Sequence, residues 1–224
     1  MIILTSLSPK HSNGANQTAA ISSWNKIAKC FSLNAPEEEK DVINSYPGIS
    51  IITTDRTMQH LYNKPLVNIN EFFHVASKLY DDLLITNSDI IIKDIPAFKQ
   101  DGITVFSRYD YIEDIIKCKK FENGFDVFYI PKKYLGIFPP SIYALGACWH
   151  DYYTPLTAIN KGIPVYTFNT PYSFHKIHSV HYPQQEYFDI GEIFRWEFKF
   201  NKKYLVPHVA QKALAIINSK LIRL

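Results

Sequence analysis

The first 95 residues alternate between short apolar runs and segments of helical periodicity, and this alternation most constrains the fold. The second helical segment has Asn70 as its expected N-cap. A strand–helix–strand–helix–strand order predicts right-handed crossovers and a mostly parallel sheet. The expected fold class is therefore α/β, with a central sheet flanked by helices. The expected strands are 1–7, 48–54 and 80–94, and the expected helices are 17–31 and 68–82.

The second half of the chain has the mixed pattern of an α+β protein. Its apolar runs are short, and its one clear helical segment stops at Gly162. No linker, repeat or low-complexity segment separates the two halves, so we expect one domain over residues 1–224. The expected strands here are 102–111, 124–132 and 163–170, and the expected helix is 151–162.

Composition and charge exclude several classes of protein. The net charge of +3 permits a polyanionic partner but lacks the Lys/Arg clusters of dedicated nucleic-acid binders. Three cysteines without CxxC spacing favour a reducing compartment over a disulfide framework or a structural zinc site. No signal peptide or membrane-spanning run is apparent. We therefore expect a cytoplasmic protein that neither binds a membrane nor requires a protein partner. The motifs GxxxxGK[ST], GxGxxG and GxSxG are absent, which argues against P-loop NTPases, most Rossmann dehydrogenases and α/β-hydrolases.

The segment YDDLLITNSDIIIKD at 80–94 reads as one buried strand interrupted by Asn87, Ser88 and Asp89. A buried carboxylate is costly unless it is paired, hydrogen-bonded or bound to a metal. Side chains two residues apart on a strand point the same way, so Asn87 and Asp89 are candidate ligands of Mg²⁺ or Mn²⁺. The alternative is a turn held by local side-chain bonds, although the apolar run at 90–92 fits a surface turn poorly.

Polar residues follow each expected strand of the first half. Ligands of open parallel sheets bind at the carboxyl ends of the strands. The segments 6–9, 53–55 and 87–89 are therefore expected on one rim of the sheet.

Asp151 stands at the start of the helical segment 151–162 and is a candidate general base. The alternative is an ordinary helix-capping carboxylate. Just upstream, Gly146 indicates a close backbone approach, and Trp149 offers a stacking face.

Three histidines, His175, His178 and His181, recur at intervals of three within SFHKIHSVHYP, as on one face of a tight helical turn or in a loop. They are candidates for a metal or phosphate site, or ordinary surface residues. Arg108 could clamp a phosphate or form an ordinary ion pair with Asp110 or Asp126. The alternatives for GFD at 124–126 are a carboxylate at a pocket mouth and a simple turn.

In this order, the segments resemble nucleotide-sugar glycosyltransferases of the GT-A fold, from residue 2 to about residue 182. TNSDI is similar to the DxD motif, with Asn87 in place of its first acid and Asp89 as its last. LGACWHDYYTPLTAINKGIPVYTF resembles the segment of inverting members in which the acid, here Asp151, is the general base. The resemblance implies a Rossmann-like nucleotide-binding half at 1–95. It also implies an acceptor half with a C-terminal helix at 96–224.

The resemblance also implies roles for individual residues. RYDY, NGFDVFYIP and HKIHSVHYP resemble a set found together in small members, where a histidine completes the metal or diphosphate site. The metal ligands would be Asp89, Asn87, and His178 or His181. The donor-binding residues would be Ser6, Ser8, Asn34, Asp55, Ser88, Arg108, His175 and Lys176. The acceptor-binding residues would be Phe125, Asp126, Gly146, Trp149 and His150.

The implied reaction moves a sugar from a nucleoside-diphosphate sugar, with a UDP-sugar favoured, to an acceptor hydroxyl with inversion. Its cofactor would be Mn²⁺ or Mg²⁺. The leading acceptor is a hydroxymethylated pyrimidine in phage-type DNA, and the alternative is a polysaccharide or glycan precursor. If Asp151 lay far from the anomeric carbon, its assignment as the base would fail and a retaining mechanism would become an alternative. A nucleotidyltransferase and a non-catalytic nucleotide-binding module are the competing classes.

Overall fold

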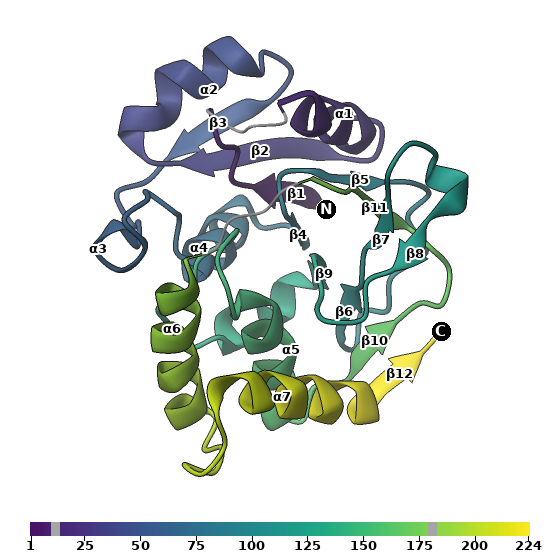
Figure 1. Cartoon of the computed structure of the whole chain (residues 1–224). Coiled ribbons are helices and arrows are strands. Elements are labelled where there is room, and N and C mark those ends of the chain that lie inside the picture. The colour runs from purple at the N-terminus through teal and green to yellow at the C-terminus, as the bar shows by residue number, and fades with distance from the viewer. Residues whose placement is uncertain (10–13, 179–182) are drawn as a thin grey trace.

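The computed structural model describes residues 1–9, 14–178 and 183–224. Within these residues an eight-stranded sheet has the order β12-β10-β6-β9-β4-β1-β2-β3 (Figure 1). Its neighbours pair in parallel, except that β9 runs antiparallel to both β4 and β6. The strands are β1 Ile2–Thr5, β2 Lys29–Asn34, β3 Ser50–Thr53, β4 Leu83–Thr86, β6 Ile103–Phe106, β9 Val127–Ile130, β10 Val165–Thr167 and β12 Leu221–Arg223.

A second, four-stranded sheet has the order β5-β11-β7-β8. Strand β11 is antiparallel to β5 and parallel to β7, and β7 is antiparallel to β8. Its strands come from both halves of the chain, so the expected boundary at residue 95 does not separate one sheet from the other. The strands are β5 Ile90–Ile92, β7 Tyr109–Tyr111, β8 Lys119–Lys120 and β11 Ser173–Lys176.

Two hydrophobic cores cover the two faces of the large sheet. Along β1, Ile2 and Leu4 point into one core and Ile3 into the other, because successive side chains of a strand face opposite sides. The first core packs against α3 Gln59–Tyr62, α4 Ile69–Leu79, α5 His150–Asn160, α6 Gln184–Glu197 and α7 Val206–Lys220. The second packs against α1 Gly14–Trp24, α2 Glu39–Ser45 and β5. Short 3₁₀ helices occupy Pro36–Glu38, Ile115–Lys117 and Lys132–Ile137.

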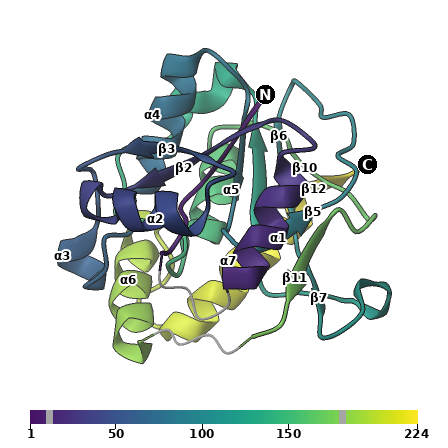
Figure 2. The ribbon, with the colours of Figure 1, turned by 90° about the horizontal axis from the view of Figure 1, so that it is seen from above.

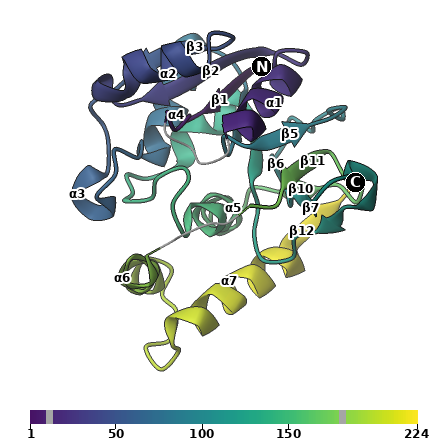
Figure 3. The same cartoon turned by 45° about the horizontal axis from the view of Figure 1, so that its top comes forward.

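The four-stranded sheet lies on the side of the molecule opposite α3 and α6 (Figures 1 and 2). Helix α1 runs beside β5 (Figure 3) and ties the two sheets together. The indole nitrogen of the buried Trp24 donates to the backbone oxygen of Ile90 at 2.8 Å. The position of β5 is therefore fixed by a side chain from the large sheet's own crossover helix.

The mixed α/β class and the mostly parallel sheet with flanking helices are confirmed. The helix predicted at 17–31 is wrong in its second half, because α1 ends at Trp24 and Lys29–Asn34 forms β2. That segment pairs in parallel with both β1 and β3, and these two ladders outweigh the local helical spacing. Among the described residues, no helix has the length and apolarity to span a membrane.

The N-cap of α4 is Asn68 and not Asn70 as predicted. The side-chain oxygen of Asn68 accepts from the backbone N–H of Asn70 at 2.8 Å. Asn70 instead holds the neighbouring loop, because its side-chain oxygen accepts from the backbone N–H and the hydroxyl of Ser141.

The segment 80–94 is two strands in different sheets and not the single strand predicted. Residues 87–89 form the turn that carries the chain from β4 to β5. The turn is half-buried and lies at the carboxyl end of a parallel strand, so its polar groups open onto a cleft. Similarly, 102–111 divides into β6 in the large sheet and β7 in the small one.

Candidate functional site

Two adjoining clefts lie at the carboxyl ends of β1 and β4. The first, which we call the histidine cleft, has a volume of about 330 Å³. It is lined by Ser6, Leu7, Ser8, Glu38, Lys64, Pro65, Leu66, Asn87, Ser88, Asp89, Arg108, Leu145, Gly146, His175 and His178. The second, which we call the aromatic cleft, has a volume of about 650 Å³. It is lined by Asn87, Arg108, Phe121, Asn123, Phe125, Asp126, Ala147, Cys148, Trp149, His150, Asp151, Tyr152, Gln184, Tyr187, Phe188 and Pro207.

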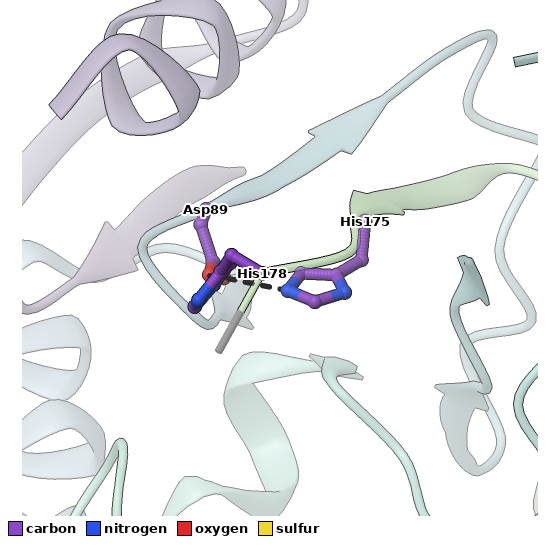
Figure 4. Close-up of side chains that lie close together, drawn as sticks. All are labelled: Asp89, His175 and His178. Atoms are coloured by element: carbon purple, nitrogen blue, oxygen red, sulfur yellow. Dashed lines mark hydrogen bonds and ion pairs between the residues drawn. The ribbon is translucent and has the colours of Figure 1, made fainter. Parts of the chain in front are cut away.

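Asp89, His175 and His178 converge in the histidine cleft (Figure 4). Asp89 comes from the β4–β5 turn, His175 from β11, and His178 from the segment just after β11. The Oδ2 atom of Asp89 is 2.9 Å from Nε2 of His178 and 3.4 Å from Nε2 of His175. One ligand atom from each residue lies within 4.8 Å of the other two. The three side chains thus form a compact donor set.

The ring of His175 is oriented from behind by Asp110. Its Nδ1 lies 2.9 Å from Oδ1 of Asp110, a carboxylate in β7 that also accepts from Nε of Arg108 at 2.8 Å. A carboxylate can only accept, so Nδ1 carries the proton and donates to Asp110, and Nε2 is the nitrogen that faces Asp89 and is available to a metal when the ring is neutral. Metal-binding histidines are commonly held in this tautomer by a second carboxylate.

The cluster favours a charged Asp89 and a positively charged partner. Burial alone would raise the pKa of Asp89, but hydrogen bonds and charge from His175 and His178 outweigh it and hold that pKa well below its usual value. Burial would lower the pKa of His175, yet Asp89 and Asp110 together raise it above its usual value, against the opposing charge of Arg108. A dication could replace the protons that the imidazoles otherwise supply to this carboxylate.

One carboxylate and two imidazoles fit a divalent transition ion. Imidazole nitrogen suits first-row transition metals, whereas Mg²⁺ favours sites built from oxygen. Three protein ligands leave positions for a substrate and water. The donor chemistry and the anchored ring of His175 therefore match a metal site that keeps open positions.

Arg108 and Asn87 line both clefts and join them. Oδ1 of Asp126 accepts from Nδ2 of Asn87 at 2.7 Å and from Nη1 of Arg108 at 3.1 Å. The Arg108 guanidinium also lies over the ring of Phe121, 4.1 Å from its centroid. The ion-pair reading of Arg108 is confirmed for both acids, Asp110 and Asp126.

Asp151 lies in the first turn of α5 and faces the aromatic cleft. Gly124 makes room for it, because a Cβ at that position would overlap Oδ2 of the Asp151 carboxylate. The glycine of the GFD segment is thus explained by close approach of a carboxylate and not by a turn alone. Burial and the charge of Asp126 raise the pKa of Asp151 to about 8, against backbone N–H groups that include those of Phe125 and Tyr152. Once ionised, such a carboxylate is a stronger base than an ordinary aspartate.

The structure places the remaining candidates as follows. Ser6, Ser8 and Ser88 line the histidine cleft, although the Ser88 hydroxyl already accepts from Nε2 of Gln17 at 2.7 Å. Asn87 points to Asp126 and is not part of the three-residue cluster. Asn34, Asp55 and Lys176 line neither cleft. His181 lies outside the described residues.

The three candidates that line neither cleft, Asn34, Asp55 and Lys176, each have a physical reason for their position. Asn34 is fully buried and holds the loop after β1, because its amide donates to the backbone oxygen of Leu7 at 2.7 Å. Asp55 is exposed beyond β3, the edge strand of the sheet. Lys176 is an exposed residue of β11 whose neighbour His175 faces inward, as strand alternation requires. The helical or loop reading of the histidine run is wrong at His175, which lies in a strand.

Two acceptor candidates have structural explanations. Trp149 is buried, and its stacking face packs on Tyr187 with ring centroids 5.2 Å apart. Gly146 lies in the histidine cleft and not in the aromatic one. Its φ of +82° explains the glycine, and a Cβ there would meet nothing within 4 Å, so close approach is not the reason. Phe125, Asp126 and His150 line the aromatic cleft.

Several lining residues were missed from the sequence. Lys64 adds a cation to the histidine cleft, and Tyr187 and Phe188 add aromatic rings to the second cleft from the start of α6. Asp110 was named only as a pairing partner of Arg108, and its contact with His175 was not foreseen. The signal available for Asp110 was its position two residues after Arg108 in RYDY.

Comparisons with known proteins give no family. No protein-family model and no curated protein matches the chain. A solved structure described as a mycobacterial protein aligns at a TM-score of 0.47 with 8% identity, over 90% of this chain and 75% of that one. A mannose-1-phosphate geranyltransferase from Thermus thermophilus aligns at 0.33 with 12% identity, over 99% of this chain and 68% of that one. At these TM-scores neither likeness identifies a fold family or a function.

Proposed function

We propose that the chain is a GT-A-type glycosyltransferase that moves a sugar from a nucleoside-diphosphate sugar to an acceptor hydroxyl, with inversion. The observation that carries this proposal is the pair of clefts joined through Asn87 and Arg108. One cleft holds the metal-type cluster and the other holds a carboxylate of raised pKa, Asp151. A transferase needs a site for the leaving diphosphate and a base for the attacking hydroxyl.

The histidine cleft would bind the donor diphosphate. Asp89, His175 and His178 would hold a divalent cation, with Mn²⁺ favoured over Mg²⁺ by the two imidazoles. Bound there, the cation would neutralise the charge that develops on the leaving group. Lys64 is an exposed cation at the same cleft and would contact the phosphates, and Ser6 and Ser8 would contact the nucleoside, for which uridine is our choice.

The aromatic cleft would bind the acceptor. Asp151 would take the proton of the acceptor hydroxyl, and the oxygen would attack the anomeric carbon as the bond to the diphosphate breaks. The electron pair of that bond would leave with the diphosphate. The acceptor hydroxyl belongs either to a hydroxymethylated pyrimidine in DNA or to a glycan.

Thermal unfolding with metals and nucleotides tests the donor site. We expect Mn²⁺ with UDP to raise the Tm of the wild-type protein, because a ligand that binds only the folded state stabilises it by linkage. Asp89→Ala and His178→Ala should remove the rise, whereas His60→Ala, an exposed histidine of α3, should retain it. No shift with UDP, GDP or ADP in the presence of Mn²⁺ would overturn the proposal.

Variants of the base separate a transferase from the competing classes. Asp151→Asn should lose at least about 100-fold in transfer, the usual scale of general base catalysis, while it keeps the Mn²⁺–UDP shift. Asp41→Asn, on the exposed face of α2, is the matched control. Wild-type transfer should rise with pH to a plateau above about 8, because the base acts only when ionised. Nucleotidyl transfer to a sugar phosphate would instead identify a nucleotidyltransferase. Nucleotide binding without any turnover would identify a non-catalytic module.

A further inference from the structure

Three buried acceptor atoms of the aromatic cleft have no hydrogen-bond partner among the described residues. They are Asn87 Oδ1, Asp126 Oδ2 and His150 Nε2, and all three residues line this cleft. Asp126 is 5% exposed and His150 is 4% exposed. Buried polar groups are nearly always satisfied, so a cluster of unsatisfied ones indicates a missing donor.

The protonation of His150 makes its free nitrogen an acceptor. Its Nδ1 lies 2.7 Å from the backbone oxygen of Ala147, and a carbonyl only accepts, so Nδ1 carries the proton. Burial lowers the pKa of His150 against the opposing effects of the Ala147 carbonyl and Asp126, so the ring is neutral. Nε2 therefore presents a lone pair.

The charge of the cleft disfavours an anionic ligand. Among the described residues that line it, Arg108 is the one cationic side chain. Its guanidinium is already paired with two acids, Asp110 and Asp126. Asp126 and Asp151 are the acids of the same cleft, and Asp151 keeps its proton up to about pH 8. A phosphate of a nucleic-acid backbone would meet these acids without a free cation to bind it.

The walls of the cleft suit the ring of a neutral molecule. Phe121, Tyr187 and Phe188 are half-buried and keep part of their ring surface open to the cleft. Aromatic faces bind apolar C–H surface, while the acceptor atoms require hydroxyl or amine hydrogens. A ligand with an apolar ring face and several hydroxyl groups around its edge meets both demands.

We propose that the aromatic cleft binds an uncharged, polyhydroxylated acceptor, the end of a glycan, whose hydroxyl groups donate to Asp126, His150 and Asn87. This proposal rests on the proposed function and decides between its two acceptors. A hydroxyl beside the attacked one donates to Oδ2 of Asp126, while the attacked hydroxyl loses its proton to Asp151. A flipped hydroxymethylcytosine brings fewer donors and carries flanking phosphates.

Saturation-transfer NMR on the full chain measures acceptor binding without any donor. The probes are methyl glycosides of glucose, galactose and mannose, their monodeoxy analogues, and a single-stranded oligonucleotide that contains 5-hydroxymethylcytosine. At least one glycoside should bind, and one deoxy analogue of it should bind at least fivefold more weakly. Asp126→Asn should weaken the parent glycoside equally and show no further loss with that analogue, as expected for a direct partner. The exposed-site variant Asp41→Asn should bind as the wild type does.

Two results would overturn the proposal. One is binding of the oligonucleotide with no signal from any glycoside, which would support a DNA acceptor. The other is a set of deoxy analogues that all bind as well as their parents, a measurement on the wild-type chain that does not depend on the folding of a variant. Failure of the glycosyltransferase itself would show in the Mn²⁺–UDP thermal shift, which reports on the other cleft.

Discussion

Asp151 and Asp89 are aspartates that their surroundings drive in opposite directions. Asp89 meets two histidines, so its ionised form is stabilised despite burial. Asp151 is buried near a second carboxylate, Asp126, and both effects raise its pKa to about 8. Pairs of carboxyl groups whose pKa values are pushed apart are typical of sites with a division of roles. One residue is suited to hold a cation and the other to exchange a proton.

The stability of Asp151→Asn should depend on pH. The folded wild type keeps the Asp151 proton up to about pH 8, whereas the unfolded chain loses it near pH 4. Wild-type stability therefore falls as pH rises across this window, and the asparagine variant escapes that loss. At pH 8.5 we expect the variant to be more stable by ~1 kcal/mol or more, about 2–4 °C in Tm. Calorimetry at pH 5 and pH 8.5 measures this, and a variant advantage that does not grow with pH would contradict it.

At the scale of elements, α4 depends on one asparagine. Asn68 caps the helix at the N–H of Asn70, and its amide also donates to the backbone oxygen of Ser141 at 2.7 Å. It thus fixes both the start of α4 and the loop that crosses it.

Asn68→Ala should lower the free energy of unfolding by about 1–2 kcal/mol, the usual cost of losing such a cap. Urea unfolding measures the loss. Asn44→Ala, an exposed position within α2, should stay within about 0.5 kcal/mol of the wild type. Equal effects of the two variants would show that the cap contributes nothing to stability.

The elements that sequence periodicity predicted best are those with a local cause. The apolar run of β1 and the strongly amphipathic α4 follow directly from spacing. Strand β2 was not predicted, because Ile27, Ala28 and Phe31 continue the helical spacing of α1. Its backbone pairs with strands on both sides, a gain that local spacing does not record.

At the scale of the whole molecule, the cluster joins the two sheets. Asp89 follows a strand of the large sheet, and His175 belongs to the small one. A cation bound to both would tie the sheets at this point.

Hydrogen exchange should report that tie. We expect Mn²⁺ to slow exchange at least threefold in residues 83–92 and 173–178, with little change in α7 at Val206–Lys220. His178→Ala should abolish the effect, while His60→Ala retains it. Slowing spread evenly over the chain, or absent from β11, would place the ion elsewhere.

Residue order alone was enough to predict the α/β class, the parallel crossovers of the first half, and Asp89 and Asp151 as candidate carboxylates. These depend on spacing along the chain and on the carboxyl-end rule of parallel sheets. Which side chains meet depends instead on the packing of distant segments. His178 lies 89 residues from Asp89 in sequence, and only the antiparallel pairing of β11 with β5 brings the two together. The protonation of Asp151 has the same origin, because burial and the charge of Asp126 are properties of the assembled cleft and not of the residue.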